Sequence, residues 1–159
     1  MAQNRANKTK GTTMNTDTTA AELLEAELFN NYAGDQFNRP MAELFAIYPS
    51  GKTSLLAFGG DVYDIISETI HADNNPTDLA GIALTTTGWA APVNMVGQCD
   101  TAPSKHPERR RVLLTAIVNA GGLFSVIRFQ DTPHETTVEA GGIGSLAHAL
   151  TDLWETVGQ

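Results

Sequence analysis

Apolar residues recur at the three- and four-residue spacing of an amphipathic helix in four parts of the chain. One part lies near the N-terminus, one ends at Tyr48, one follows Asp61 and one closes the chain. Asp61 has a short carboxylate side chain of the kind that caps helix N-termini, so it marks the start of the third helix. The spacing therefore predicts helices over residues 19–33, 40–48, 61–71 and 144–157.

Other apolar runs are predicted to be strands. Residues 53–60 and 80–90 are short runs of apolar and β-branched residues, and the second has Trp89 near its end. Residues 109–130 hold two apolar runs around Asn-Ala-Gly-Gly, whose glycines supply the positive φ of a tight hairpin. Neither run alternates cleanly, so we expect this hairpin to be central and covered on both faces. The pattern predicts an α+β fold with about four mainly antiparallel strands and helices packed over the sheet.

Three polar segments flank or separate these elements. Residues 1–16 are rich in Asn, Thr and Lys, and they are predicted to be a disordered leader ahead of a single α+β domain at 17–159. Residues 92–108 are predicted to form a long polar loop, and residues 131–143 a loose acidic loop.

The composition is that of an acidic globular protein. The 159 residues are 42% hydrophobic and carry a formal net charge of −8. This balance argues against non-specific nucleic-acid binding, which needs a sustained basic surface. No apolar run reaches the ~20 residues of a membrane span, and the first 20 residues lack the apolar centre of a secretion signal. We therefore expect a cytoplasmic protein with no membrane and no nucleic-acid partner.

Residues 99–111 concentrate the reactive side chains. Cys99 and His106 share the polar loop, and they would form a thiolate nucleophile only if the fold brought them into contact. Ser104 beside His106 is the weaker pair, because a serine nucleophile also needs an oxyanion hole. The chain has one cysteine, which excludes an intrachain disulfide, and four histidines that lie apart without metal-ligand spacing. No cofactor and no metal site are predicted.

The same loop leads into the most basic segment of the chain. Residues 101–128 contain five Lys and Arg side chains and one acid. Guanidinium groups are planar forks suited to carboxylates and phosphates. Because side chains alternate along a strand, we expect Arg109 and Arg111 on one face and Arg110 on the other. The candidate binding residues are Ser104, Lys105, His106, Arg109, Arg111 and Trp89.

A structural role is the alternative explanation of these cations. Twelve acids lie between residues 12 and 100, and five follow Arg128. The arginines would then pair with acidic helices of the same molecule. Each exposed pair of that kind would contribute only ~0–1 kcal/mol to stability.

Residues 78–130 resemble a group of actinobacterial and actinobacteriophage proteins with no assigned activity. A small-residue strand ending in Gly-Trp, a Pro-Ser-x-His-Pro-x-Arg loop and a strand hairpin carry the resemblance, and the loop matches at Pro103, Ser104, His106, Pro107 and Arg109. The resemblance implies a bacterial or phage source and a shared fold, and it implies no reaction. His106 and Pro107 would then shape the loop, with the imidazole hydrogen-bonded to the backbone.

Three functions are compatible with these features. The first is a non-enzymatic binding or regulatory protein that acts through contacts with an unknown protein partner, in the host cytoplasm if it is phage-encoded. The second is a small hydrolase or transferase that uses the 99–111 loop. The third is a virion or assembly component, which a large exposed apolar patch or a fixed homo-oligomer would favour. We favour the first function, which makes the protein a binding protein and not an enzyme.

Overall fold

The structure is a computed structural model that describes residues 18–91, 102–141 and 145–158. The predicted leader at 1–16, Cys99 and much of the predicted 92–108 loop lie outside these residues. The described part of the chain forms an α+β arrangement, as predicted. None of its helices has the length and apolar character needed to cross a membrane.

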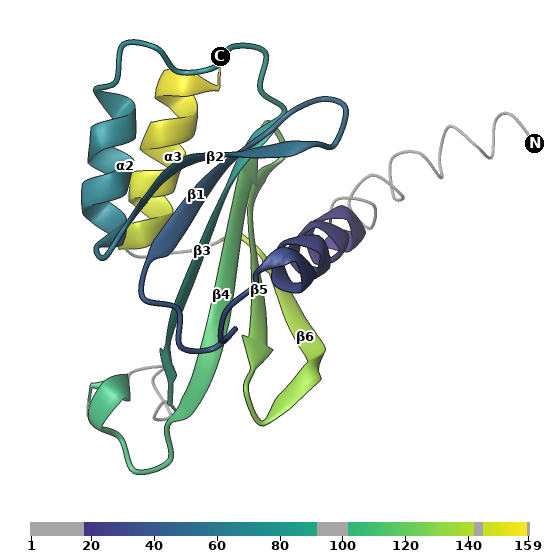
Figure 1. The fold of residues 1–159 in the computed structure, drawn as a ribbon, viewed down its shortest axis with the longest axis vertical. Coiled ribbons are helices and arrows are strands. Elements are labelled where there is room, and N and C mark those ends of the chain that lie inside the picture. The colour runs from purple at the N-terminus through teal and green to yellow at the C-terminus, as the bar shows by residue number, and fades with distance from the viewer. Residues whose placement is uncertain (1–17, 92–101, 142–144, 159) are drawn as a thin grey trace, which may run out of the picture.

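One antiparallel sheet organises the described residues. Its strands are β1 (Ala42–Ile47), β2 (Thr53–Gly59), β3 (Gly81–Ala90), β4 (Arg110–Asn119), β5 (Gly122–Phe129) and β6 (Thr132–Ala140). They lie side by side in the order β2-β1-β3-β4-β5-β6 (Figure 1). The sheet therefore has six strands instead of the predicted four, whereas the antiparallel pairing is confirmed.

β1 corrects the predicted helix at residues 40–48. Leu44 and Ala46 are buried on one face of the sheet, and Phe45 and Ile47 are partly buried on the other. A short apolar run that fits a helical spacing also fits a strand buried on both faces, because it is too short to show a distinctive period. β1 lies between β2 and β3, and pairing with both neighbours favours the strand.

β6 corrects the predicted acidic loop at residues 131–143. Val138 is its one side chain packed on a core, and it lies among Thr, His and Glu residues. The segment therefore lacks the alternation of apolar and polar residues that marks a half-buried strand. β6 pairs with β5 at the edge of the sheet, so backbone pairing and not apolar burial places it there.

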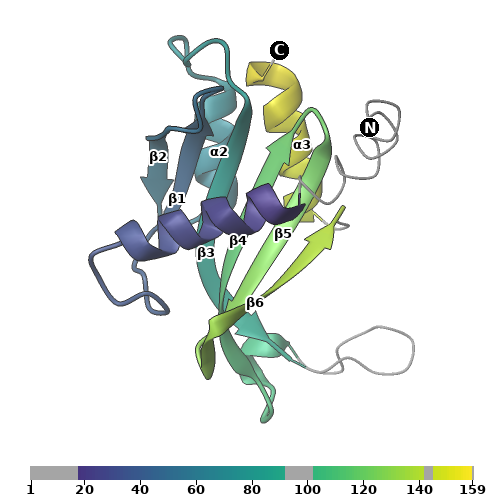
Figure 2. The same ribbon diagram turned by 90° about the vertical axis from the view of Figure 1, so that its right-hand side faces the viewer.

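Helices cover both faces of the sheet. α2 (Val62–Ile70) and α3 (Ser145–Val157) lie side by side on one face, and the helix at residues 18–31 crosses the other face (Figure 2). Asp61 caps α2 as predicted, because its Oδ1 accepts hydrogen bonds from Tyr63 N at 2.8 Å and from Asp64 N at 3.1 Å. The predicted hairpin is confirmed as β4 and β5, with Gly122 at a φ of 120° as the first residue of β5 after the turn.

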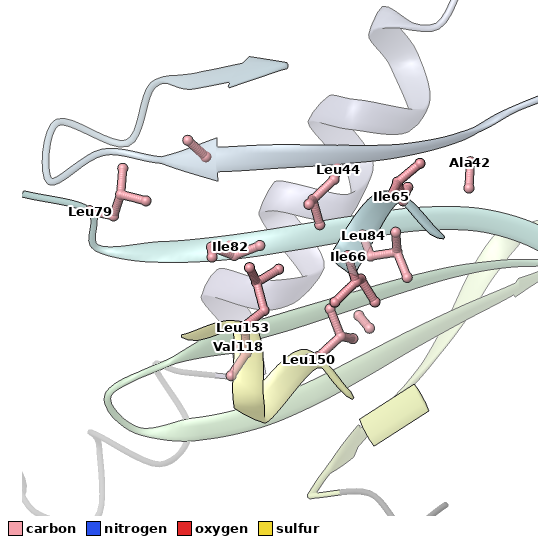
Figure 3. Packing of buried hydrophobic residues seen from close by; sticks show 12 residues of the cluster. Ala42, Leu44, Ile65, Ile66, Leu79, Ile82, Leu84, Val118, Leu150 and Leu153 are labelled. Carbon is pink, nitrogen blue, oxygen red and sulfur yellow. The ribbon is translucent and has the colours of Figure 1, made fainter. Parts of the chain in front are cut away.

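The main core lies between the sheet and the layer of α2 and α3 (Figure 3). A smaller core lies on the other face, under the helix at 18–31. β4 and β5 contribute side chains to both cores, which confirms that their hairpin is covered on both faces. The largest fully buried side chains of the main core are Leu44, Ile65, Ile82, Leu84, Leu150 and Leu153.

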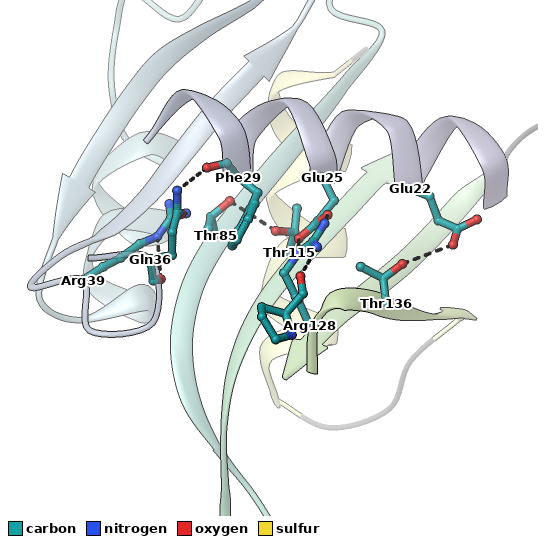
Figure 4. A network of polar contacts seen from close by, with 10 residues as sticks. Glu22, Glu25, Phe29, Gln36, Arg39, Thr85, Thr115, Arg128 and Thr136 are labelled. Atoms are coloured by element: carbon teal, nitrogen blue, oxygen red, sulfur yellow. Dashed lines mark hydrogen bonds and ion pairs between the residues drawn. The ribbon is translucent and has the colours of Figure 1, made fainter. Parts of the chain in front are cut away.

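A buried ion pair joins the helix at 18–31 to β5. Glu25 is 0% exposed and Arg128 is 8% exposed. Arg128 donates from Nε to Glu25 Oε2 at 2.8 Å and from Nη2 to Glu25 Oε1 at 2.5 Å (Figure 4). Its Cζ lies 4.1 Å from the centre of the Phe29 ring, and its Nη1 donates to Pro133 O at 2.5 Å. Both charged groups are therefore paired and hydrogen-bonded, and the pair links this helix to β5 beside the smaller apolar core.

Candidate functional site

The Pro-Ser-Lys-His segment is a compact turn ahead of β4. Pro103–Lys105 form a 3-10 turn, η1, and it packs against β3. Glu108 N donates to His106 Nδ1 at 3.0 Å, and Arg109 N donates to His106 O at 3.2 Å. The imidazole and carbonyl of His106 therefore shape the loop through backbone hydrogen bonds, which confirms the predicted role of this side chain.

Two arginines lie against the ring of Trp89. Trp89 is opposite Arg111 in the ladder between β3 and β4. The centre of its ring is 5.0 Å from Arg111 Cζ and 4.8 Å from Arg109 Cζ. Arg110 lies on the other face, with its Cζ 3.8 Å from the centre of the Phe129 ring, so the predicted alternation is confirmed. We call Trp89, Arg109 and Arg111 the arginine–tryptophan patch.

Hydrogen bonds hold both guanidinium groups of the patch. Arg111 donates from Nε to Phe37 O at 2.7 Å and from Nη2 to Thr87 Oγ1 at 3.1 Å. Arg109 donates from Nη1 to His106 O at 3.2 Å. Within the described residues, the Nε–Nη2 edge of Arg109 has no hydrogen-bond partner. This edge has the geometry that binds a carboxylate through two parallel hydrogen bonds.

The other arginines of the described residues are paired with carboxylates. Asp131, in the turn between β5 and β6, pairs with Arg110, and both side chains are largely exposed. Arg128 pairs with an acidic helix as the structural explanation predicts, and Arg110 pairs with a carboxylate in a turn, whereas Arg109 and Arg111 have no ion pair within the described residues. The shortest distances between nitrogen and oxygen are 3.6 Å for Arg39–Glu43, 2.5 Å for Arg110–Asp131 and 2.5 Å for Arg128–Glu25.

These contacts shift the pKa values of two carboxylates near the patch. The hydrogen bond from Arg110 holds the pKa of Asp131 below its ordinary value, and the same bond raises the pKa of Arg110. The pKa of Asp35 is lowered by hydrogen bonds from the Asn38 side chain and the Phe37 backbone, and further by the positive charge of Arg111. Asp35 thus stabilises the turn whose carbonyl holds Arg111.

The structure also places the other predicted site residues. Ser104 and Lys105 lie exposed on η1, without a side-chain hydrogen bond or ion pair among the described residues. His106 Nδ1 accepts from Glu108 N, and the described residues contain no hydrogen bond between Ser104 and His106. Cys99 lies outside them, and no group of His, Cys, Asp and Glu within them is arranged to hold a metal ion.

Sequence reasoning missed the two groups that hold Arg111. Thr87 precedes Trp89 by two residues in β3, so strand alternation could have placed its hydroxyl on the same face. Phe37 acts through its carbonyl from 74 residues away, and no local signal points to it. The comparison of this chain with protein-family models, curated proteins and solved structures finds no match.

Proposed function

We propose that this protein is a non-enzymatic binding protein, and that the arginine–tryptophan patch recognises an acidic segment of a partner protein. One observation carries the proposal. Arg109 and Arg111 lie on the exposed ring of Trp89 without an acidic partner in the described residues, whereas every other described arginine has one. Two unneutralised cations on an aromatic ring attract a negatively charged partner.

The chemistry of the patch suits a protein interface. Trp and Arg are enriched among the residues that dominate binding energy at such interfaces. Trp89 is 39% exposed, so a partner side chain has access to its ring. Because hydrogen bonds already hold Arg109 and Arg111, less conformational entropy is lost when a ligand binds.

The surroundings of the patch favour a short acidic segment over a nucleic acid. Lys105 on η1 adds one further cation, while Glu108, Asp35 and Asp131 are acids close to the three neighbouring arginines. Nucleic acids bind through many phosphate contacts along an extended basic surface. A segment with one or two carboxylates needs only the free edge of Arg109 and the charge of Arg111.

The test is a selection of short random peptides displayed as a library and bound to the immobilised protein. We expect enriched peptides to place Asp or Glu beside an apolar residue. Arg109→Gln should weaken their binding at least about tenfold, as for an interface hot spot. Arg110→Gln is the matched control, because it removes the same charge one residue away on the opposite face and should leave binding nearly unchanged.

Other results would contradict the proposal. Enriched peptides that bind wild type and Arg109→Gln equally would place the interface elsewhere. Equal losses in Arg109→Gln and Arg110→Gln would show a response to net charge and not to the patch. The absence of any enriched acidic peptide would also overturn it. Circular dichroism and thermal unfolding verify that each variant is folded.

A further inference from the structure

We propose a second binding surface at one edge of the sheet, where β2 takes an extended segment of another protein as an added strand. The segment that fits is rich in both apolar and basic residues. This surface is separate from the arginine–tryptophan patch, so the inference does not depend on the proposed function. We call the surface the β2 groove, and it is lined by residues 54–57 and by residues of α2 and the turn that follows it.

The two edge strands of the sheet differ in their protection against pairing. β6 carries Pro133, Glu135 and Glu139, and proline and charged residues are devices that prevent an edge from pairing with another chain. β2 contains neither proline nor a charged residue. One side of its backbone has no neighbouring strand in the described residues. β2 is therefore the edge that is open to a further strand.

A β-bulge brings two large apolar side chains of β2 to the same face. The pairing with β1 shifts by one residue, so that Leu55 pairs with Phe45 and Phe58 with Glu43. Phe45 and Glu43 lie two residues apart and share a face, hence Leu55 and Phe58 share one too. Leu55 is 47% exposed and Phe58 is 62% exposed. Alternate apolar side chains of an added strand would pack on this pair.

A groove follows β2 on the side of α2. Four consecutive residues of β2, 54–57, form one wall of a cavity of about 460 Å³. Glu68 and Thr69 of α2 and the turn at 72–76 form the other wall. Asn75 Nδ2 donates to Thr69 O at 2.8 Å, which ties the turn to the end of the helix. Because consecutive strand residues line the groove, it runs along the backbone that an added strand would pair with.

The charge on this side of the molecule selects a basic partner. α2 carries Asp64 and Glu68 and no Lys or Arg, and Asp61 caps its N-terminus. Glu68 lines the groove itself. A second copy of this chain paired antiparallel through β2 would bring two acidic α2 helices to the same face, which like-charge repulsion disfavours. A segment with Lys or Arg toward α2 and apolar residues toward Leu55 and Phe58 meets both requirements.

The same peptide library tests this surface when Phe58→Lys is used for counter-selection. We expect the surviving peptides to contain alternating apolar and basic residues. Phe58→Lys should weaken the binding of these peptides at least about tenfold, since it removes the apolar surface on which their alternate apolar side chains would pack and adds a cation to an edge that binds a basic segment. Glu68→Gln should weaken the binding of these peptides severalfold. Leu23→Lys is the matched control, because it also replaces an exposed apolar side chain with lysine. Leu23 is 67% exposed on the helix at 18–31, so this variant should leave peptide binding unchanged. Arg109→Gln should also leave it unchanged.

If these peptides bind as an added strand, their backbone N–H groups must pair with β2. Methylation of alternate backbone nitrogens removes the donors that would pair with β2, so it should abolish binding while charge and side chains stay the same. Full binding by the methylated peptides would overturn the proposal. So would selected peptides that bind Phe58→Lys as tightly as wild type, or the absence of basic peptides. Sedimentation that shows wild type, but not Phe58→Lys, to be a dimer would instead assign the edge to a second copy.

Discussion

Neighbouring arginines at the start of β4 have different roles, because a strand directs successive side chains to opposite faces. Arg110 reaches Asp131 in the turn between β5 and β6 and donates to it from Nε at 2.9 Å and from Nη2 at 2.5 Å. Arg109 and Arg111 reach Trp89 instead, where backbone carbonyls and a hydroxyl accept their hydrogen bonds and no carboxylate of the described residues lies within ion-pair distance. At the residue scale, the ion pair with Asp131 neutralises Arg110, whereas Arg109 and Arg111 have no ion pair in the described residues and remain available to a ligand.

Asp131 offers a direct measurement of this pairing. Arg110→Gln removes the hydrogen bond that lowers the pKa of Asp131, so we expect that pKa to rise toward the ordinary value of about 3.9. A titration of the Asp131 carboxyl carbon followed by NMR would measure the change. Arg109→Gln is the control, because it removes a nearby charge without touching Asp131. An unchanged pKa in Arg110→Gln would show that the pair does not persist in solution.

The same pair has a defined effect on stability. The pKa of Asp131 is lower in the folded state than in the unfolded chain, so the pair stabilises the fold above the unfolded-state pKa of about 4. This contribution is lost as the pH falls through the lower folded-state pKa. Arg110→Gln should therefore flatten the dependence of the unfolding free energy on pH below about pH 4. Near neutral pH, the slope of the unfolding free energy against pH should be the same in wild type and variant.

At the scale of elements, one ion pair attaches the helix at 18–31 to the sheet. Glu25→Ala leaves the guanidinium of Arg128 buried without its carboxylate, and we expect it to lower the free energy of unfolding by about 3–5 kcal/mol. Chemical denaturation measures this loss. A loss below about 1 kcal/mol would show that the helix is held mainly by its apolar contacts.

A double variant distinguishes the charge effect from lost packing. Glu25→Leu combined with Arg128→Met replaces both charged groups with apolar side chains of similar length, which removes the cost of burying unpaired charge. We expect this variant to recover most of the stability that Glu25→Ala loses. If it is as unstable as Glu25→Ala, the hydrogen bonds of Arg128 to Glu25 and to Pro133 O contribute more than the burial of charge costs.

At the scale of the whole molecule, the main core joins α3 to strands of the sheet that lie far from it in the sequence. Leu150 of α3 is 0% exposed and belongs to the same core as Ile82 and Leu84. Leu150→Ala should lower the free energy of unfolding by about 2–5 kcal/mol, because it leaves a cavity. Leu23→Ala removes an exposed leucine and should change it by no more than about 0.5 kcal/mol. Similar losses for both variants would contradict the assignment of Leu150 to the core.

The two proposed surfaces lie at different places on the sheet. The arginine–tryptophan patch lies where β3 ends and β4 begins, near η1, and the β2 groove follows the strand at one edge of the sheet. Figure 1 shows β2 at that edge, with β3 and β4 inside the sheet. Their charges differ, since Arg109 and Arg111 of the patch have no ion pair in the described residues, whereas Glu68 lines the groove and α2 carries no Lys or Arg. One partner with an acidic and a basic segment, or two partners, could therefore be bound at once.

The elements with long or well-marked patterns were predictable from the sequence. α2 has a cap at Asp61 and an apolar stripe, and the hairpin of β4 and β5 has two apolar runs around a glycine turn. Part of the candidate site was predictable for the same reason, since alternation separated Arg110 from its neighbours. The role of His106 in the loop followed from the resemblance and is confirmed by its hydrogen bond with Glu108 N.

Local sequence alone thus determined the segments with a clear period or cap, because those signals act between residues a few positions apart. The tertiary structure decided β1 and β6, since pairing with β3 and with β5 made strands of a short apolar run and of a polar segment. It also decided which charges are neutralised. Glu25 and Arg128 are 103 residues apart, and only the packing of the helix at 18–31 on the sheet brings them together.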